Sequence, residues 1–178
     1  MKTGIWGLIP IEKVYWTLEY LIAIKHTTMM KFKIKSGLFF CMLLLTGITN
    51  AQIKEVYIEG YDDMTYSKEQ IIANPGQQLK VILKTISDLP EEQMAHNFVL
   101  LKKETDVMSF VTAGSRQPSN EYIEPTYSDR IIAATDMLAG GESDTVMFKA
   151  PEETGEYEYV CTFPGHYIAG MKGTLEVK

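Results

Sequence analysis

After residue 51, apolar side chains recur mainly with the two-residue period that is typical of half-buried strands. In the segment 79–85, for example, Leu79, Val81 and Leu83 occupy alternate positions, with Lys80 and Lys84 on the opposite face. The pattern predicts about eight short strands, at 53–58, 70–72, 79–85, 97–101, 130–134, 145–148, 157–162 and 174–177. Short strands at such spacing predict an all-β fold, a Greek-key β-sandwich.

The segment 103–127 interrupts this series of strands. Lys103–Ala113 is compatible with one short helix, and Gly114–Pro125 is rich in residues that form loops. Turns are also predicted at 74–76, 139–143 and 151–155. No repeat or linker divides residues 52–178, so we expect one domain, a sandwich with one short helical flap.

The first 51 residues have a different pattern. A basic stretch, Met29–Lys35, precedes an apolar run over 37–48, and Thr49-Asn50-Ala51 resembles a cleavage site. The apolar run is shorter than the roughly 20 residues of a membrane span, so we expect a signal peptide over 29–51 and no stable membrane insertion after cleavage. Signal peptides begin at the chain start, so residues 1–28 are expected to be an upstream extension from a misassigned translation start.

The domain that export would leave, residues 52–178, is strongly acidic. Removing the six lysines and two glutamates of residues 1–51 from the chain's 17 basic and 23 acidic residues leaves eleven and 21, a net charge of −10. Such a charge argues against nucleic acid as a partner, because phosphates select basic surfaces, and it favours a basic protein partner. This domain also has one cysteine, which excludes an internal disulfide.

The residues that carry chemistry are few and closely spaced. Cys161, His166 and Met171 lie within eleven positions, and His96 lies 65 residues before Cys161. After residue 51 there is no other cysteine or histidine. One thiolate, two imidazoles and a thioether form the ligand set of a type 1 copper site, which is trigonal His₂Cys with a weak axial methionine. The sequence therefore predicts that these four residues bind one copper ion.

The sequence between these residues suits that geometry. Cys161 ends a predicted strand, and the turn Phe163-Pro164-Gly165 brings His166 back toward it. Asn97 and Thr162 are expected to form hydrogen bonds around the cysteine that lower the electron density of its sulfur. The alternative for both residues is an ordinary turn-capping role.

These segments resemble those of the cupredoxins, and within them the azurin and auracyanin group. Met94-Ala95-His96-Asn97-Phe98 is similar to the first ligand region of azurins, and Cys161-Thr162-Phe163-Pro164-Gly165-His166 is similar to their ligand loop. The resemblance extends over nearly all of residues 52–178. It implies the cupredoxin Greek-key fold, one type 1 copper ion and electron transfer in the periplasm.

The chain departs from azurins in three places. Four residues separate His166 from Met171, as in auracyanin-like proteins, where azurins have three. Ala95 stands where azurins have a glycine whose carbonyl approaches copper, so Ala95 is a candidate for a weak axial backbone contact. Azurins also carry a disulfide, which is excluded here. The chain is therefore azurin-like rather than an azurin.

A single metal site favours a one-electron carrier and not an enzyme. Copper nitrite reductases and multicopper oxidases need additional histidines for further copper ions, and both histidines of this domain are already assigned. The alternative is a periplasmic copper chaperone or storage protein. Such proteins favour methionine-rich or Cys-x-x-Cys sites, whereas the other methionines here are scattered.

A carrier must also dock with its partners. The imidazole edge of His166 is expected to reach the surface, and apolar neighbours are expected to form a docking patch around it. The patch consists of Leu89, Met94, Pro164, Ile168 and Ala169. The alternative is that these residues only cover the metal. Together with the negative charge, the patch favours a monomeric periplasmic carrier between respiratory redox proteins, with a basic c-type cytochrome or an oxidase as partner.

Overall fold

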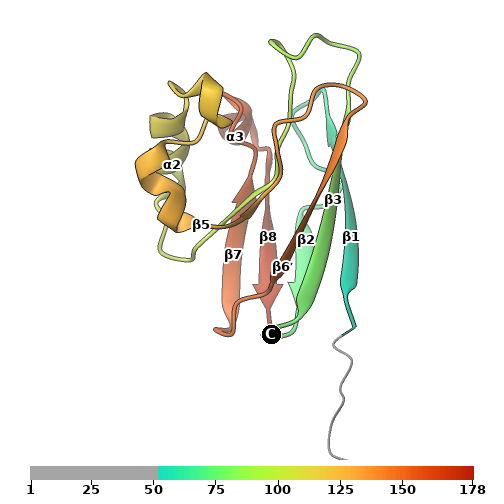
Figure 1. Cartoon of the computed structure of the whole chain (residues 1–178), viewed down its shortest axis with the longest axis vertical. Coiled ribbons are helices and arrows are strands. Elements are labelled where there is room, and N and C mark those ends of the chain that lie inside the picture. The colour runs from blue at the N-terminus through green and yellow to red at the C-terminus, as the bar shows by residue number, and fades with distance from the viewer. Residues whose placement is uncertain (1–51) are drawn as a thin grey trace, which may run out of the picture. The chain divides into compact units, whose positions relative to one another are not determined.

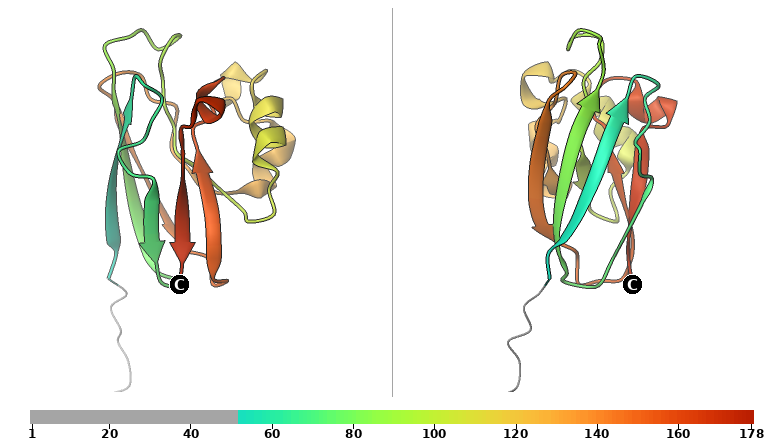
Figure 2. Two further views of the ribbon diagram at one scale, coloured as in Figure 1. Left: turned by 180° about the vertical axis from the view of Figure 1, so that it is seen from behind. Right: turned by 90° about the vertical axis from the view of Figure 1, so that its right-hand side faces the viewer.

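Two facing β-sheets form the domain, as the computed structural model shows for residues 52–178 (Figures 1 and 2). The predicted signal peptide and upstream extension lie outside these described residues. The strands are β1 (Lys54–Tyr61), β2 (Gln70–Ala73), β3 (Gln78–Ile86), β4 (Val99–Leu101), β5 (Ile131–Ala134), β6 (Ser143–Lys149), β7 (Gly155–Val160) and β8 (Lys172–Val177). The predicted all-β sandwich is confirmed.

The chain passes repeatedly from one sheet to the other. One sheet has the strand order β1-β3-β6, and the other has the order β2-β8-β7-β4-β5. β1 pairs in parallel with β3, and β2 pairs in parallel with β8, while the remaining pairings are antiparallel. β1 and β3 are parallel because the chain crosses to the other sheet, through β2, between them.

The core lies between the sheets and follows the alternation seen in the sequence. In β1, Val56 and Ile58 are buried while Tyr57 between them is exposed. In β3, Leu79 and Leu83 are fully buried. The two-residue period therefore gives the inward face of these strands correctly.

A second apolar cluster lies on the outer face of the five-stranded sheet, beneath helix α2 (Val107–Gly114). Phe110 and Val111 of the helix pack there with Val99 of β4 and Val160 of β7. Figure 2 shows α2 and the turns that follow it on this side of the sandwich. The flap therefore packs against β4, which follows His96, and β7, which precedes Cys161.

The helical segments differ from the expectation in detail. α2 begins four residues later than the predicted helix 103–113, because Asp106 caps it by accepting a hydrogen bond from the backbone N–H of Ser109 (3.2 Å). Three short helices were not predicted: the 3₁₀ helices η1 (Pro118–Asn120) and η2 (Pro125–Arg130), and α3 (His166–Ala169). α3 lies inside the predicted ligand loop.

The loops that carry the candidate ligands gather at one end of the sandwich. The β3–β4 and β7–β8 loops lie at the upper end in Figure 1, and the chain ends at the opposite end. Within residues 52–178, none of the helices has the length and apolar character needed to cross a membrane.

We predict that Leu83→Ala destabilises the domain far more than Ile86→Ala on the same strand. Leu83 is fully buried, and such a truncation lowers the free energy of unfolding by about 2–5 kcal/mol. Ile86 is 38% exposed, so its truncation should cost less than about 1 kcal/mol. Urea denaturation of the metal-free protein measures both values, and equal losses would contradict the inward orientation of Leu83.

Candidate metal centre

His96, Cys161 and His166 meet in the interior at the loop end of the sandwich. Cys161 Sγ lies 3.4 Å from His166 Nδ1 and 4.0 Å from His96 Nδ1. The potential ligand atoms of the three residues all lie within 4.8 Å of one another. His96 and Cys161 are completely buried, and His166 is 3% exposed. The fold therefore brings together three of the four ligands that the sequence predicts.

The strand register explains why these residues meet. β4 and β7 are antiparallel neighbours, with Val99 opposite Val160. His96 precedes one strand and Cys161 follows the other, so both lie at the same end of the pair. The turn after Cys161 then returns the chain, because the backbone N–H of His166 donates to the carbonyl of Phe163 (3.1 Å).

Met171 and Ala95 lie beside this group. The backbone N–H of Cys161 donates to the carbonyl of Met171 (3.3 Å), and the Met171 side chain is fully buried, with its terminal methyl and the His96 ring both next to Gly60. The carbonyl oxygen of Ala95 lies 3.9 Å from Cys161 Sγ. A thioether and a backbone carbonyl are thus available near the trigonal group.

Asn97 and Thr162 connect the two segments that carry the ligands. Asn97 Nδ2 donates to Thr162 Oγ1 (2.7 Å), and Asn97 Oδ1 accepts from the backbone N–H of Thr162 (2.9 Å). Both residues are buried. The Thr162 hydroxyl donates to the carbonyl of Glu121 (2.6 Å), so the expectation that it donates to the sulfur is wrong, since its single proton is already used.

The backbone of His96–Phe98 is held on almost every side. The backbones of His96 and Leu138 each donate to the other's carbonyl. The backbone N–H of Phe98 donates to the Thr135 hydroxyl, and the carbonyl of Phe98 accepts from the Thr135 N–H. The carbonyl of Asn97 accepts from the hydroxyl of the buried Tyr66. Burial raises the pKa of Cys161, and the backbone amide of Asn97 opposes that rise.

Burial keeps the metal-free site uncharged. It raises the pKa of Cys161 to about 12, although the backbone amides of Asn97 and Phe163 oppose this shift. Burial lowers the pKa of His166 to about 4, with a further lowering from His96, and burial also lowers the pKa of His96. At neutral pH the group is therefore a thiol and two neutral imidazoles, and a metal cation at the sulfur would displace the thiol proton.

The spacing and chemistry of these donors fit a first-row transition metal. With metal–sulfur bonds of about 2.3 Å and metal–nitrogen bonds of about 2.0 Å, a trigonal plane separates sulfur from nitrogen by about 3.7 Å. The observed separations of 3.4 and 4.0 Å bracket this value. Two imidazoles and one thiolate with a nearby thioether are the donor set of a type 1 copper site.

Four of the five residues of the predicted docking patch are exposed. Ile168 is 72% exposed and Leu89 is 41% exposed, and Pro164 and Ala169 are also exposed. Met94 is only 7% exposed, so its expected place in an accessible patch is wrong: its loop turns at Pro90, whose carbonyl accepts from the Met94 N–H (3.0 Å), and the side chain lies beneath the surface. The expected exposed edge of His166 is also absent, because only 3% of the residue is exposed and the Phe163 ring packs against it, with centroids 4.6 Å apart.

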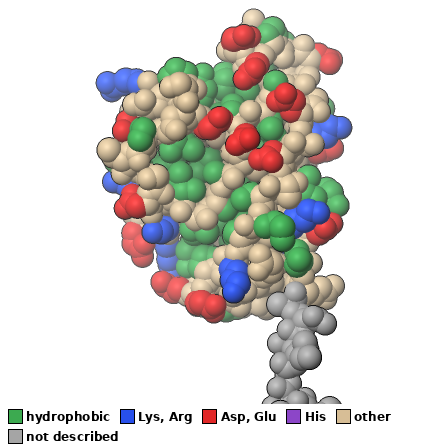
Figure 3. Space-filling view, in the orientation of Figure 1, with side chains coloured by type: hydrophobic (Ala, Val, Ile, Leu, Met, Phe, Trp, Pro, Cys, Tyr) green, Lys and Arg blue, Asp and Glu red, His purple; other side chains and the backbone are tan. Residues whose placement is uncertain are grey.

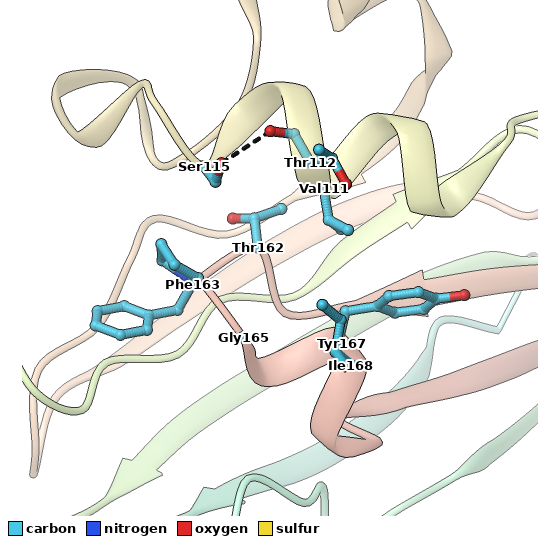
Figure 4. A pocket seen from close by; sticks show the side chains of 9 residues that line it. Val111, Thr112, Ser115, Thr162, Phe163, Gly165, Tyr167 and Ile168 are labelled. Carbon is cyan, nitrogen blue, oxygen red and sulfur yellow. Dashed lines mark hydrogen bonds between the residues drawn. The ribbon is translucent and has the colours of Figure 1, made fainter.

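A shallow pocket separates this loop from α2 (Figure 4). From the loop it is lined by Thr162, Phe163, Pro164, Gly165, Tyr167 and Ile168, and from α2 and the residue after it by Val111, Thr112 and Ser115. None of these lining residues is charged. The apolar surface near the candidate ligands therefore continues toward the helical flap.

Comparison with known proteins agrees with this geometry. Residues 54–178 match the family described as copper binding proteins, plastocyanin/azurin family. An azurin from Achromobacter denitrificans is 39% identical over 126 residues, which cover 69% of this chain and 83% of the azurin. The structure of auracyanin A, a "blue" copper protein from Chloroflexus aurantiacus, has a TM-score of 0.63 and 30% identity, covering 71% of this chain and 100% of that chain. An azurin structure from Methylomonas sp. strain J has a TM-score of 0.62 and 32% identity, covering 70% of this chain and 98% of that chain.

The matched region begins with β1 and ends after β8, so it contains both sheets and every candidate ligand. The resemblance to the azurin and auracyanin group that the ligand segments indicated is confirmed, and the two sheets have the cupredoxin fold of these relatives. Family, fold and donor set agree on copper as the metal. The chain belongs to the plastocyanin/azurin family of copper-binding proteins.

Proposed function

We propose that this protein carries single electrons, using one type 1 copper ion. The proposed ligands are His96, Cys161, His166 and, as weaker axial contacts, Met171 and the carbonyl of Ala95. The observation that carries the proposal is the convergence of two Nδ1 atoms on one buried sulfur, at 3.4 and 4.0 Å. When bound, copper supplies a one-electron couple between its cuprous and cupric states.

The protein holds the ligands in fixed positions and excludes water from them. The hydrogen bonds of Asn97 and the two-way bonding of His96 with Leu138 hold the ligand-bearing backbone without any help from the metal. Because all three trigonal ligands are nearly or fully buried, water has little access to the site. Ligands that move little between two oxidation states make electron exchange fast, which suits a carrier.

The same features support a carrier over the alternatives. Within residues 52–178, only one group of three His, Cys, Asp or Glu side chains lies close enough to hold a metal ion, and it consists of His96, Cys161 and His166. This argues against the second copper site that an oxidase would need. A copper chaperone or storage protein would need ligands that an acceptor can reach. The ligands here are at most 3% exposed, which argues against ready transfer of the ion.

We further propose a periplasmic, monomeric carrier that connects respiratory redox proteins and docks through the exposed patch residues Leu89, Pro164, Ile168 and Ala169. The cleavage-site pattern before residue 52 and the net charge of −10 after it support export and a basic partner, such as a c-type cytochrome or an oxidase. Figure 3 shows acidic side chains gathered over the upper end of the molecule. Asp88 and Glu91 lie on either side of Leu89 in the sequence and are exposed, so they can attract a basic partner to the patch.

We predict that Cys161→Ser abolishes an intense visible band that the wild-type protein acquires with Cu(II). The band arises from charge transfer between the Cys161 thiolate and copper, and serine has no thiolate. The measurement is an absorption titration with Cu(II), followed by ascorbate, which should remove the band until reoxidation restores it. Met108→Ala, at a 49% exposed position on α2, should leave the band unchanged. Bound copper without this band in the wild-type protein would refute the ligand set and favour the chaperone alternative.

Asn97→Ala is predicted to weaken copper binding about 10–100-fold, as loss of groups that orient metal ligands commonly does. It also leaves the buried N–H of Thr162 without its acceptor, which should lower the free energy of unfolding of the metal-free protein by about 1–3 kcal/mol. Chelator competition and urea denaturation measure these two effects. Thr162→Val keeps that N–H bond and should have the smaller effect on affinity; wild-type affinity in Asn97→Ala would show that the ligands hold themselves in place.

Ile168→Lys is predicted to slow electron exchange with a basic c-type cytochrome about tenfold, equivalent to about 1.4 kcal/mol. The change removes an apolar side chain of the patch that is 72% exposed, and it opposes a like-charged partner. The control Met147→Lys adds the same charge on β6, at a 53% exposed position, and should leave the rate unchanged. Stopped-flow absorbance gives both rates, with the charge-transfer band as a check on the site. Equal slowing by both variants would remove Ile168 from the interface.

A further inference from the structure

Gly60 occupies a position where the pattern of β1 calls for a core side chain. Val56 and Ile58 face the core, and Gly60, the next inward position, is also buried. Its φ lies outside the left-handed region that favours glycine, unlike that of Gly165 or Gly170. The backbone conformation therefore gives no reason for a glycine here, and the reason must lie in what surrounds it.

Two of the proposed copper ligands fill the space that a side chain would take. A Cβ atom on Gly60 would lie 2.8 Å from His96 Cδ2, 3.0 Å from His96 Cγ and 3.0 Å from Met171 Cε. Carbon atoms in contact prefer separations of about 3.5–4.0 Å, so an added methyl group would overlap both side chains. The imidazole and the thioether methyl thus rest directly on the backbone of Gly60.

We infer that Gly60 is a positioning residue, whose backbone is the wall that holds the Met171 thioether and the His96 ring in place. This inference rests on the proposed ligand set. The wall is itself well supported: Gly60 pairs with Thr85 of β3 and forms an isolated bridge with Tyr66. The Thr85 hydroxyl donates to the carbonyl of Leu138 (3.0 Å), the residue that also bonds the His96 backbone.

The two side chains would not yield equally to a methyl group at this position. The His96 ring is restrained by the backbone bonds to Leu138 and by packing on the His166 ring, with centroids 5.1 Å apart. Met171 has an unbranched, flexible side chain, so its terminal methyl would move first. An added methyl should therefore alter the weak axial contact before it alters the trigonal ligands, and the axial contact tunes the reduction potential of such sites.

The test is Gly60→Ala, with Gly141→Ala as the matched control. For Gly60→Ala we expect a changed charge-transfer spectrum, a shifted reduction potential and copper binding about tenfold weaker. In the metal-free protein, the NMR resonances of the Met171 methyl and the His96 ring should also move. At Gly141, φ is 86° and a Cβ meets no atom within 4 Å, so Gly141→Ala should strain the backbone and lower stability while leaving all these signals unchanged.

A folded Gly60→Ala protein with wild-type spectrum, potential and Met171 methyl resonance would overturn the inference. If the variant does not fold, the wild-type protein decides: nuclear Overhauser effects from the Gly60 α-protons to the Met171 methyl and to the His96 ring are expected, and their absence overturns the inference. Failure of the ligand set would be seen separately, as wild-type protein that binds copper without a charge-transfer band, and the metal-free resonances would still test the contact at Gly60.

Discussion

The paired hydrogen bonds between Asn97 and Thr162 are the interaction on which the metal centre depends. Strand register alone brings the segments before β4 and after β7 to the same end of the sheet, but it does not fix their distance. The amide of Asn97 closes that gap by donating to one group of Thr162 and accepting from another. The backbone amide of the same residue opposes the rise that burial gives to the pKa of Cys161, so one residue both joins the two ligand segments and favours the thiolate.

A second constraint follows from burial. The site is assembled from groups that are neutral without a metal, because the low-dielectric interior disfavours both a thiolate and an imidazolium. The polar backbone around His96 finds its partners within the protein, so this backbone needs no ion to satisfy it, although the ring nitrogen His96 Nε2 is buried without a hydrogen-bond partner. Copper would therefore enter a site that already exists, and the energy of folding and the energy of metal binding are largely separate.

How far the sequence predicts this arrangement depends on the range of the interactions. The alternation of Leu79, Val81 and Leu83 predicts an inward face because pleating is a local property. The ligands could be identified because two histidines and one cysteine leave little choice after residue 51. The partner of the Thr162 hydroxyl lies 41 residues away at Glu121, so it has no local signal in the sequence. The late start of α2, by contrast, has a local signal. Asp106 is a good N-cap residue, but the composition of Lys103–Ala113 obscured it.

The loop after Cys161 satisfies much of its own backbone. α3 is bounded by Gly165 and Gly170, both with left-handed φ, and the amides of Ala169, Gly170 and Met171 bond to carbonyls within the same loop. None of these three bonds involves a strand of the sandwich. A loop of this kind can gain or lose a residue between His166 and Met171 without disturbing the strands. In evolutionary terms the loop is a module, and descendants of one scaffold can vary its length while they inherit the same framework.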